Sequence, residues 1–294
     1  NAVAPMLPRW LSEDYGSLLP GQERKGMALK SIWNGTTLSD FRFEECLVKN
    51  DKTFSYEEFQ ALEGFPRIQV QAIASFLKGS LSEDSHEWVE QCMILYNLKV
   101  AELFRQESRG LLRQRQPGEF EAATYVPTGT GETHADFHTY YTHATSPLRR
   151  YADLLAQRHM QEILTARKSL VNPNGLLLHH LNKRNKQSKS FERDCFFLKQ
   201  VSLASSGSVE CEIRDMITVA DLWKLTVWVP SWNRFVKLRV SGTFTDGLHI
   251  TRKDQSETFN VKVGDTCQLK YYCDMTQPNW KRRLVLSLTN LKKD

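Results

Sequence analysis

The sequence predicts an α+β protein in two parts, in which a mixed helix-and-strand domain precedes a small all-β domain. The first observation is a stripe of apolar residues at three- and four-residue spacing between Ser85 and Arg105, which is typical of an amphipathic helix. The second is a change of period after Gln200, where apolar and polar residues alternate as in half-buried strands. We therefore expect two domains, residues 1–200 and 201–294.

The first hundred residues mix turn, strand and helix signals. The Asn34-Gly35 pair is a strong hairpin signal between two apolar segments. Ser55 opens a Ser-Tyr-Glu-Glu sequence, which has the pattern of a helix capping box. These signals predict a looping lead-in from Pro5, strands over Lys25–Trp33 and Phe41–Lys49, and helices over Ser55–Leu62, Ile68–Leu77 and Ser85–Arg105.

The middle of the chain contains a loop signal and a basic helix. Gly118–Glu132 is expected to be a loop because it contains Pro127-Thr128-Gly129 and a further glycine. Leu177–Gln200 has the pattern of a third long helix, with the basic segment NKRNKQSK in its middle. A basic helix face is usually only solvated, but this one belongs to a larger positive region of the chain.

Alternating segments after Gln200 indicate a small antiparallel barrel of the OB type, a frequent binder of single-stranded nucleic acid. The strands expected are Ser208–Ile217, Leu222–Trp232, Phe235–Val240, Val263–Asp274 and Arg282–Leu288. Aromatic side chains on them can stack bases, although most should fill the core. These aromatic residues are Trp228, Trp232, Phe235, Tyr271 and Tyr272.

Composition and charge limit the class of protein. The six cysteines show no Cys-x-x-Cys spacing, which argues against a zinc site and favours reduced thiols in an intracellular setting. The sequence contains no apolar run of 18 residues, so no membrane span is expected. The first ten residues, NAVAPMLPRW, do not resemble a signal peptide. Because it also lacks an initiator Met, we interpret the chain as a segment or a processed product.

The positive charge is concentrated in one region. The net charge of the whole chain is +5. Between Tyr141 and Gln200, eleven Lys and Arg stand against four Asp and Glu, a surplus of seven that exceeds the surplus of the whole chain. A polyanionic partner is therefore expected to bind this region.

One stretch in this region, YTHATSPLRRYADLLAQR, carries the strongest functional signal. Ser146 followed by Pro147 is typical of a helix start, because a hydroxyl can cap free N–H groups and proline tolerates the first helical position. Arg149 and Arg150 would then lie in the first turn, beside the hydroxyls of Thr145 and Ser146. Two cations beside free N–H groups favour a phosphate site, and salt bridges to neighbouring carboxylates are the alternative.

This stretch, Tyr141–Arg158, resembles the signature near the active site of the RNase II (RNB) exoribonuclease family. Weaker resemblances follow in the family's order: PMLPRWLSEDYGSLLPGQER upstream, EWVEQCMILYNLKVAELF in the long helix, and KSFERD in the later helix. The segment LTVWVPSW is similar to the terminal OB-fold domain of many members. The resemblance implies a partial RNB-type catalytic domain over residues 1–200 and an OB-fold domain over 201–294.

The resemblance also implies an activity, namely magnesium-dependent hydrolysis of single-stranded RNA from the 3′ end, with release of 5′-mononucleotides. Arg149 and Arg150 would be the catalytic residues. Arg149 would stabilise the scissile phosphate, and Arg150 would be its neighbour that either supports the backbone or contacts a phosphate. Glu192 would bind the terminal ribose, whose 2′-hydroxyl distinguishes RNA from DNA, and an ion pair with Lys189 is the alternative for this residue. Further RNA contacts are expected from Thr145, Ser146, Lys186 and Lys189.

No metal ligands are expected in this chain. In the family, clustered aspartates hold the magnesium and lie before the PMLP segment, and this sequence contains no Asp-Asp or Asp-x-Asp pair. The ligands are therefore expected outside this segment, in an N-terminal portion of the same protein, and a larger RNA-processing complex is a further possible partner. The alternatives to a nuclease are a catalytically inactive RNB-fold RNA-binding protein and an unrelated structural protein.

Overall fold

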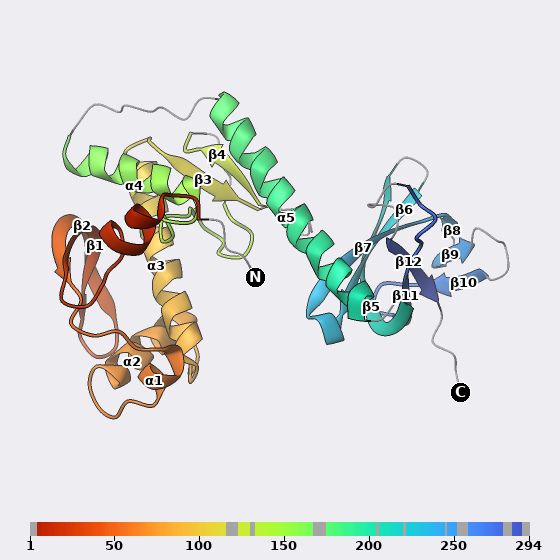
Figure 1. Cartoon of the computed structure of the whole chain (residues 1–294), viewed down its shortest axis with the longest axis horizontal. Helices are drawn as coiled ribbons and strands as arrows, with labels where there is room; N and C mark the ends of the chain where they lie inside the picture. The colour runs from red at the N-terminus through yellow and green to blue at the C-terminus, as the bar shows by residue number, and fades with distance from the viewer. Residues whose placement is uncertain are drawn as a thin grey trace. The chain divides into compact units, whose positions relative to one another are not determined.

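The computed structural model describes residues 5–115, 123–129, 133–166, 175–203, 206–219, 222–244, 246–251, 258–278 and 284–289. The chain divides into two compact units, Asn1–Asn185 (unit 1) and Lys186–Asp294 (unit 2), and the division falls within helix α5 (Gly175–Leu203; Figure 1). Helices and strands are mixed in the chain, so the α+β prediction is confirmed. In the described part of the chain, no helix is both long and apolar enough to cross a membrane.

Unit 1 begins with a short helical element, followed by the predicted hairpin. The lead-in contains η1 (Trp10–Tyr15), a π-helix that the sequence did not predict. Strands β1 (Glu23–Trp33) and β2 (Leu38–Lys49) then pair in antiparallel register. Oδ1 of Asn34 accepts hydrogen bonds from the backbone N–H groups of residues 36 (2.9 Å) and 37 (2.8 Å). The turn is stabilised by these local bonds, which explains why the sequence alone predicted it.

Three helices follow, as expected. Helix α1 (Tyr56–Gln60) begins with the predicted capping box, in which Oγ of Ser55 accepts from the Glu58 N–H (3.1 Å) and the Glu58 carboxylate accepts from the Ser55 N–H (2.7 Å). Helices α2 (Arg67–Lys78) and α3 (Ser85–Gln106) agree with the predicted ranges to within a residue.

The apolar stripe of α3 packs against α4 (Tyr151–Leu164), the helix that follows the arginine pair. Val100 and Phe104 of α3 are fully buried and share a core cluster with Ala156 and Met160 of α4. The α4 helix therefore has a fixed position on α3, and the residues before it are attached to that core.

The predicted loop Gly118–Glu132 contains a strand, so this prediction is wrong in part. Strands β3 (Leu111–Gln114) and β4 (Thr124–Pro127) form an antiparallel hairpin. Asn182 of α5 stabilises β4, because its Oδ1 accepts from the Tyr125 N–H (2.7 Å) and its Nδ2 donates to the Tyr125 carbonyl (2.9 Å). The strand depends on partners distant in sequence, which outweighed the turn signal of Pro127 and Gly129. Of the predicted loop, residues 118–122 and 130–132 lie outside the described residues.

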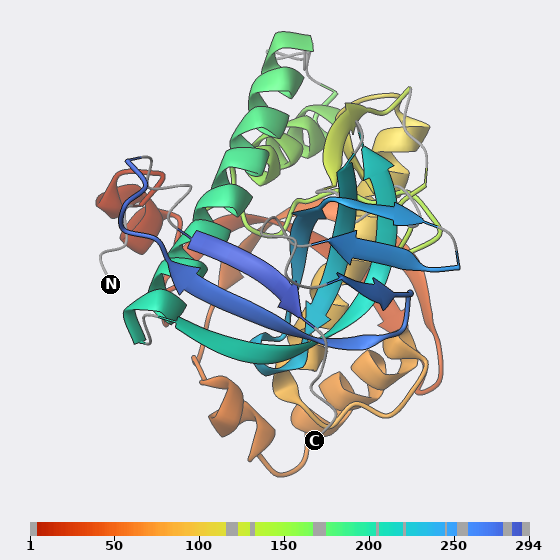
Figure 2. The same ribbon diagram turned by 90° about the vertical axis from the view of Figure 1, so that its right-hand side faces the viewer.

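Unit 2 contains a curled antiparallel sheet in the order β12-β11-β5-β6-β7 (Figure 2). The bounds are β5 (Ser206–Val219), β6 (Leu222–Val229), β7 (Arg234–Val240), β11 (Thr266–Cys273) and β12 (Leu284–Thr289). Each corresponds to a predicted strand, although a 3-10 turn, η2 (Pro230–Trp232), ends β6 early and Arg282 lies outside the described residues. The curled sheet is consistent with the predicted OB-type barrel.

The sequence missed a second, smaller sheet in unit 2. It contains β8 (Gly242–Phe244), β9 (Leu248–Thr251) and β10 (Thr258–Val261), in the order β10-β9-β8. These strands have only three or four residues each, which is too short for an alternating pattern to be recognised.

The aromatic residues of unit 2 fall into two groups. The centre of the Trp232 ring lies 5.7 Å from that of Phe197 on α5 and 5.4 Å from that of Tyr271. Trp232 and Tyr271, two of the predicted base-stacking residues, therefore pack in the core of unit 2. Phe235 and Tyr272 are exposed, and Phe235 contacts the half-buried Trp228 at 4.8 Å. Most of these aromatic side chains therefore pack within the protein.

Leu269 on β11 tests the assigned core of unit 2. We expect Leu269→Ala to lower the free energy of unfolding by about 2–5 kcal/mol, because the side chain is fully buried and its removal leaves a cavity. The exposed neighbour provides a matched control, since Lys270→Ala should change stability by less than about 0.5 kcal/mol. Hydrogen exchange of the β11 amides measures the loss of stability in both variants. Equal losses would contradict the assignment of Leu269 to the buried face of β11 and Lys270 to the exposed face.

Candidate functional site

The turn that carries both arginines lies before α4 and not inside it. The Ser146 carbonyl accepts hydrogen bonds from the N–H groups of Arg149 (3.2 Å) and Arg150 (3.0 Å), which closes a turn around Pro147. Arg150 is the N-cap residue, with an extended backbone (φ −132°, ψ 122°), so the helix begins at Tyr151. Among the described residues no side chain caps this helix, so the predicted Ser146 cap, with both arginines in the first helical turn, is wrong.

Asp153, in the first turn of α4, provides the physical reason. Its carboxylate is fully buried, and Oδ1 accepts hydrogen bonds from the Ser146 N–H and from Nη2 of Arg150, both at 2.8 Å. In the described part of the chain, Oδ2 of Asp153 and Nε of Arg150 are buried without a hydrogen-bond partner. The salt bridge that was the alternative to a phosphate site is thus present for Arg150, whose positive charge is paired with the Asp153 carboxylate.

Arg149 differs from Arg150 in exposure and in pairing. Its side chain is exposed, and no carboxylate of the described residues forms an ion pair with its guanidinium. A guanidinium presents several N–H donors in one plane and can bind two phosphate oxygens at once. The turn therefore directs one uncompensated cation toward solvent and keeps the other paired.

Side chains from two helices fix the segment that leads into this turn. Asn97 of α3 is buried, and its Oδ1 accepts from the Ala144 N–H at 2.9 Å while its Nδ2 donates to the Tyr141 hydroxyl at 2.9 Å. Nε2 of Gln157, on α4, donates to the Ala144 carbonyl at 2.6 Å. The backbone at Ala144 is thus hydrogen-bonded on both sides, which limits how far the turn can move.

A cluster of side chains on the β3-β4 hairpin contains Arg113, which the sequence analysis did not single out. The Tyr125 hydroxyl lies 2.8 Å from Nδ1 of His143, and the Arg113 guanidinium lies 5.3 Å from the centre of the Tyr125 ring. Burial raises the pKa of Tyr125 and Tyr141. The positive charges of Arg113 and Arg150 act in the opposite direction on both groups. The pairing of β3 with β4 places Arg113 opposite Tyr125. This pairing could not be foreseen because the residues of β4 were predicted to be a loop.

The remaining predicted contacts lie on α5, in unit 2. Lys186, Lys189 and Glu192 are all exposed on this helix. Among the described residues no ion pair joins Glu192 to Lys189, so the alternative for Glu192 is not observed. The structure thus brings Thr145 and Ser146 together with the arginine pair in unit 1, while the α5 residues belong to the other unit. The roles of all these residues stay predictions.

The described residues contain no cluster of metal-binding side chains. No group of three or more His, Cys, Asp or Glu side chains among them could hold a metal. The buried carboxylate at the turn, Asp153, already accepts from Arg150 and from the Ser146 backbone.

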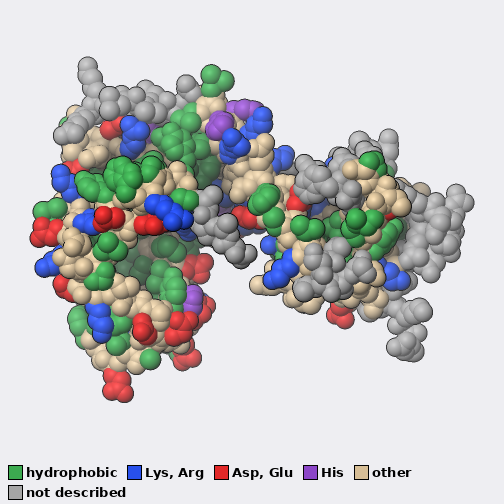
Figure 3. Space-filling view, viewed as in Figure 1, with side chains coloured by type: hydrophobic (Ala, Val, Ile, Leu, Met, Phe, Trp, Pro, Cys, Tyr) green, Lys and Arg blue, Asp and Glu red, His purple; other side chains and the backbone are tan. Residues whose placement is uncertain are grey.

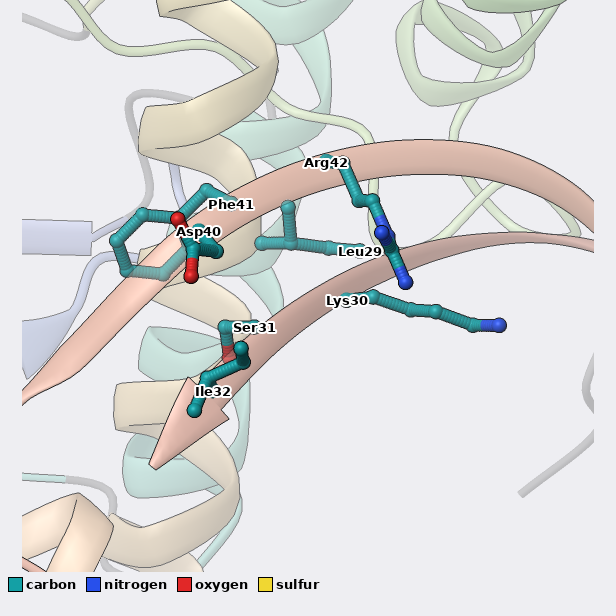
Figure 4. A pocket seen from close by; sticks show the side chains of 7 residues that line it. All are labelled: Leu29, Lys30, Ser31, Ile32, Asp40, Phe41 and Arg42. Atoms are coloured by element: carbon teal, nitrogen blue, oxygen red, sulfur yellow. The ribbon is translucent and has the colours of Figure 1, made fainter. Parts of the chain in front are cut away.

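Hollows of two kinds are found among the described residues of unit 1. One, of about 680 Å³, lies on the β1-β2 hairpin and is lined by residues 29–32 and 40–42 (Figure 4). Its Lys30 is paired with Glu44, and it contains none of the predicted site residues. The other, of about 440 Å³, includes Thr145 and Pro147 of the turn and is otherwise mainly apolar. Only the second hollow therefore adjoins the arginine turn.

The chain resembles known proteins in its fold but not in its sequence. No protein-family model and no curated protein matches the chain. Mycoplasma genitalium RNase R, solved with ribose-methylated single-stranded RNA, aligns at a TM-score of 0.63 and 15% identity over 97% of this chain and 61% of its own. Yeast Ssd1, a pseudonuclease, aligns at a TM-score of 0.57 and 12% identity over 91% of this chain and 44% of its own. The chain thus spans less than two thirds of either protein.

The Asp153–Arg150 pair is the contact at this site whose removal should cost most. We expect Asp153→Ala to lower the free energy of unfolding by about 3 kcal/mol, because it leaves a partly buried guanidinium and the Ser146 N–H unpaired. Glu102→Ala is the matched control, since it breaks the more exposed Lys99–Glu102 pair of the same i,i+3 spacing and should cost less than about 1 kcal/mol. Chemical denaturation measures both, and similar small losses would contradict a supporting role for Asp153.

Proposed function

We propose, from the RNB-type fold that this chain has, that the protein binds single-stranded RNA and that the turn before α4 contacts its phosphate backbone. The observation that carries the proposal is the difference between the two arginines. Arg150 is paired with the buried Asp153, whereas Arg149 is exposed and has no ion-pair partner among the described residues. An unpaired cation on a fixed turn is suited to bind an anion, because the backbone of the turn does not have to be ordered first.

The charge distribution supports a polyanionic ligand. The surplus of seven positive charges between Tyr141 and Gln200 includes the exposed Lys186 and Lys189 of α5. Lysines of this kind bind phosphates without reading sequence, and they make affinity depend on salt. The structure of RNase R contains single-stranded RNA, which supports RNA as the ligand of a protein with the same fold.

The finer proposal is that the protein hydrolyses RNA from the 3′ end and releases 5′-mononucleotides. Arg149 would donate hydrogen bonds to the scissile phosphate and stabilise the charge that develops on its oxygens in the transition state. Glu192 would accept hydrogen bonds from the terminal ribose hydroxyls. Magnesium would supply the activated water, and its ligands would come from outside the described residues, which contain no acidic cluster.

RNA binding without hydrolysis is the second candidate. The similarly folded yeast Ssd1 is a pseudonuclease, and the sequence of this chain contains no Asp-Asp or Asp-x-Asp pair. In this case Arg149 would anchor a phosphate without promoting its reaction. The two candidates share the same binding site and differ only in what happens to the bound RNA.

A labelled RNA distinguishes the two candidates. With the full-length protein and magnesium, we expect a 5′-labelled single-stranded RNA to be bound and then shortened progressively from its 3′ end. Binding without shortening would support the second candidate. The DNA strand of the same sequence is the matched control for recognition of the ribose. If the protein binds neither strand at low ionic strength, the proposed function is wrong.

Arg149→Ala tests the residue at the centre of the site. We expect it to weaken RNA binding modestly and to reduce the slope of log affinity against log salt by about 0.7, the value for one lost phosphate contact on a single strand. If the protein is a nuclease, turnover should fall about 10²–10³-fold. As a control, Arg42→Ala removes the same charge from an exposed position on β2. It should change neither the RNA affinity with its salt slope nor the turnover. Unchanged binding and turnover in Arg149→Ala would show that its assignment is wrong.

A further inference from the structure

The lead-in segment contains an element of a rare kind. In η1 the Gly16 N–H donates to the Leu11 carbonyl at 2.8 Å, which is a bond across five residues. π-helices are uncommon and occur frequently at functional sites. The contacts proposed above for Arg149, Lys186, Lys189 and Glu192 do not involve this element.

Two large aromatic side chains of η1 are exposed. Trp10 is 67% exposed and Tyr15 is 69% exposed, although both are of a type that folding normally buries. They are five residues apart, which in a helix with bonds across five residues places them one turn apart on the same side. On the face of unit 1 seen in Figure 3, hydrophobic side chains gather in the region of η1 and α4, next to charged ones.

The element is fixed to β1 by a largely buried arginine. Nη2 of Arg24 bonds the Asp14 carboxylate at 3.1 Å and the Asp14 carbonyl at 3.2 Å, and Nε donates to the Ser17 carbonyl at 3.1 Å. These bonds hold the C-terminal end of η1. Because the aromatic side chains are attached to an ordered backbone, a ligand that contacts them would not have to order this segment first.

A close contact joins the same end of η1 to the arginine turn. A Cβ atom built on Gly16 would lie 2.9 Å from Cδ2 of Leu148, so the two residues pack closely, and it would lie 2.8 Å from the Leu11 carbonyl oxygen, which disfavours any larger residue there. Tyr15 is the neighbour of Gly16 in the chain, and Arg149 is the neighbour of Leu148. The exposed residues Tyr15 and Arg149 are therefore the chain neighbours of two residues that pack together.

We propose that Trp10 and Tyr15 form a stacking platform for bases of the single strand whose phosphate Arg149 binds, which rests on the proposed function. Aromatic rings stack on the faces of all four bases, and they do so without reading sequence. A cation for the phosphate beside aromatic rings for the bases is the combination that single-stranded nucleic acids require. The platform adds a base-binding subsite to a site whose other proposed contacts are to phosphates and to the terminal ribose.

The test measures RNA affinity for Trp10→Ala and Tyr15→Ala. Each is expected to bind an RNA oligonucleotide about tenfold more weakly, the loss of one base stack, with an unchanged salt slope because no charge is removed. Trp10→Phe and Tyr15→Phe keep a ring and should restore most of the affinity. Phe65→Ala is the matched control, since Phe65 is 77% exposed in the same unit and should have no effect.

An oligonucleotide in which abasic sites replace the bases gives the second measurement. It keeps the phosphates, so the alanine variants and the wild-type protein should bind it equally. If the alanine variants bind intact RNA as the wild type does while Arg149→Ala weakens binding, the platform is wrong and the proposed function stands. If Arg149→Ala also binds as the wild type does, both are wrong. A loss of affinity that persists on abasic RNA would likewise overturn the stacking proposal, because it would not depend on bases.

Discussion

The buried carboxylate of Asp153 is the interaction on which the arginine turn depends. One of its oxygens accepts hydrogen bonds from the backbone at Ser146 and from the side chain of Arg150, and thus joins both ends of the turn to α4. A buried carboxylate is costly unless it is paired, so the turn and the ion pair stabilise each other. Because α4 is itself packed on α3, the position of the turn is set by the core of unit 1.

The same interaction separates two arginines that are adjacent in sequence. Arg150 is used by the fold, and Arg149 is left exposed with no ion-pair partner among the described residues. The Asn97 and Gln157 amides hold the backbone before the turn, and Gly16 packs against Leu148 within it. Contacts from α3, α4 and η1 thus fix the turn from several sides. This rigidity is what a phosphate ligand would use.

In unit 1, the sequence predicted two elements that depend on local bonds and missed a strand that depends on a distant partner. The Asn34 turn and the Ser55 capping box form from neighbouring residues, and both were confirmed. Strand β4 is stabilised by Asn182 of α5, fifty-seven residues away, and was taken for a loop. The helix start at the arginine pair was misplaced for a different reason, because two local arrangements compete there. Ser146-Pro147 is a valid local signal, but the buried side chain of Asp153 stabilises a separate turn instead.

We propose that Asp153 holds Arg150 so that Arg149 can bind a phosphate of single-stranded RNA. The most direct measurement is an experimental structure of the protein with a short single-stranded RNA. The expected result is a phosphate oxygen within hydrogen-bond distance of the Arg149 guanidinium, with Arg150 still paired to Asp153. An RNA bound elsewhere on the protein, or a phosphate held by Arg150 after its pair with Asp153 has broken, would contradict the account.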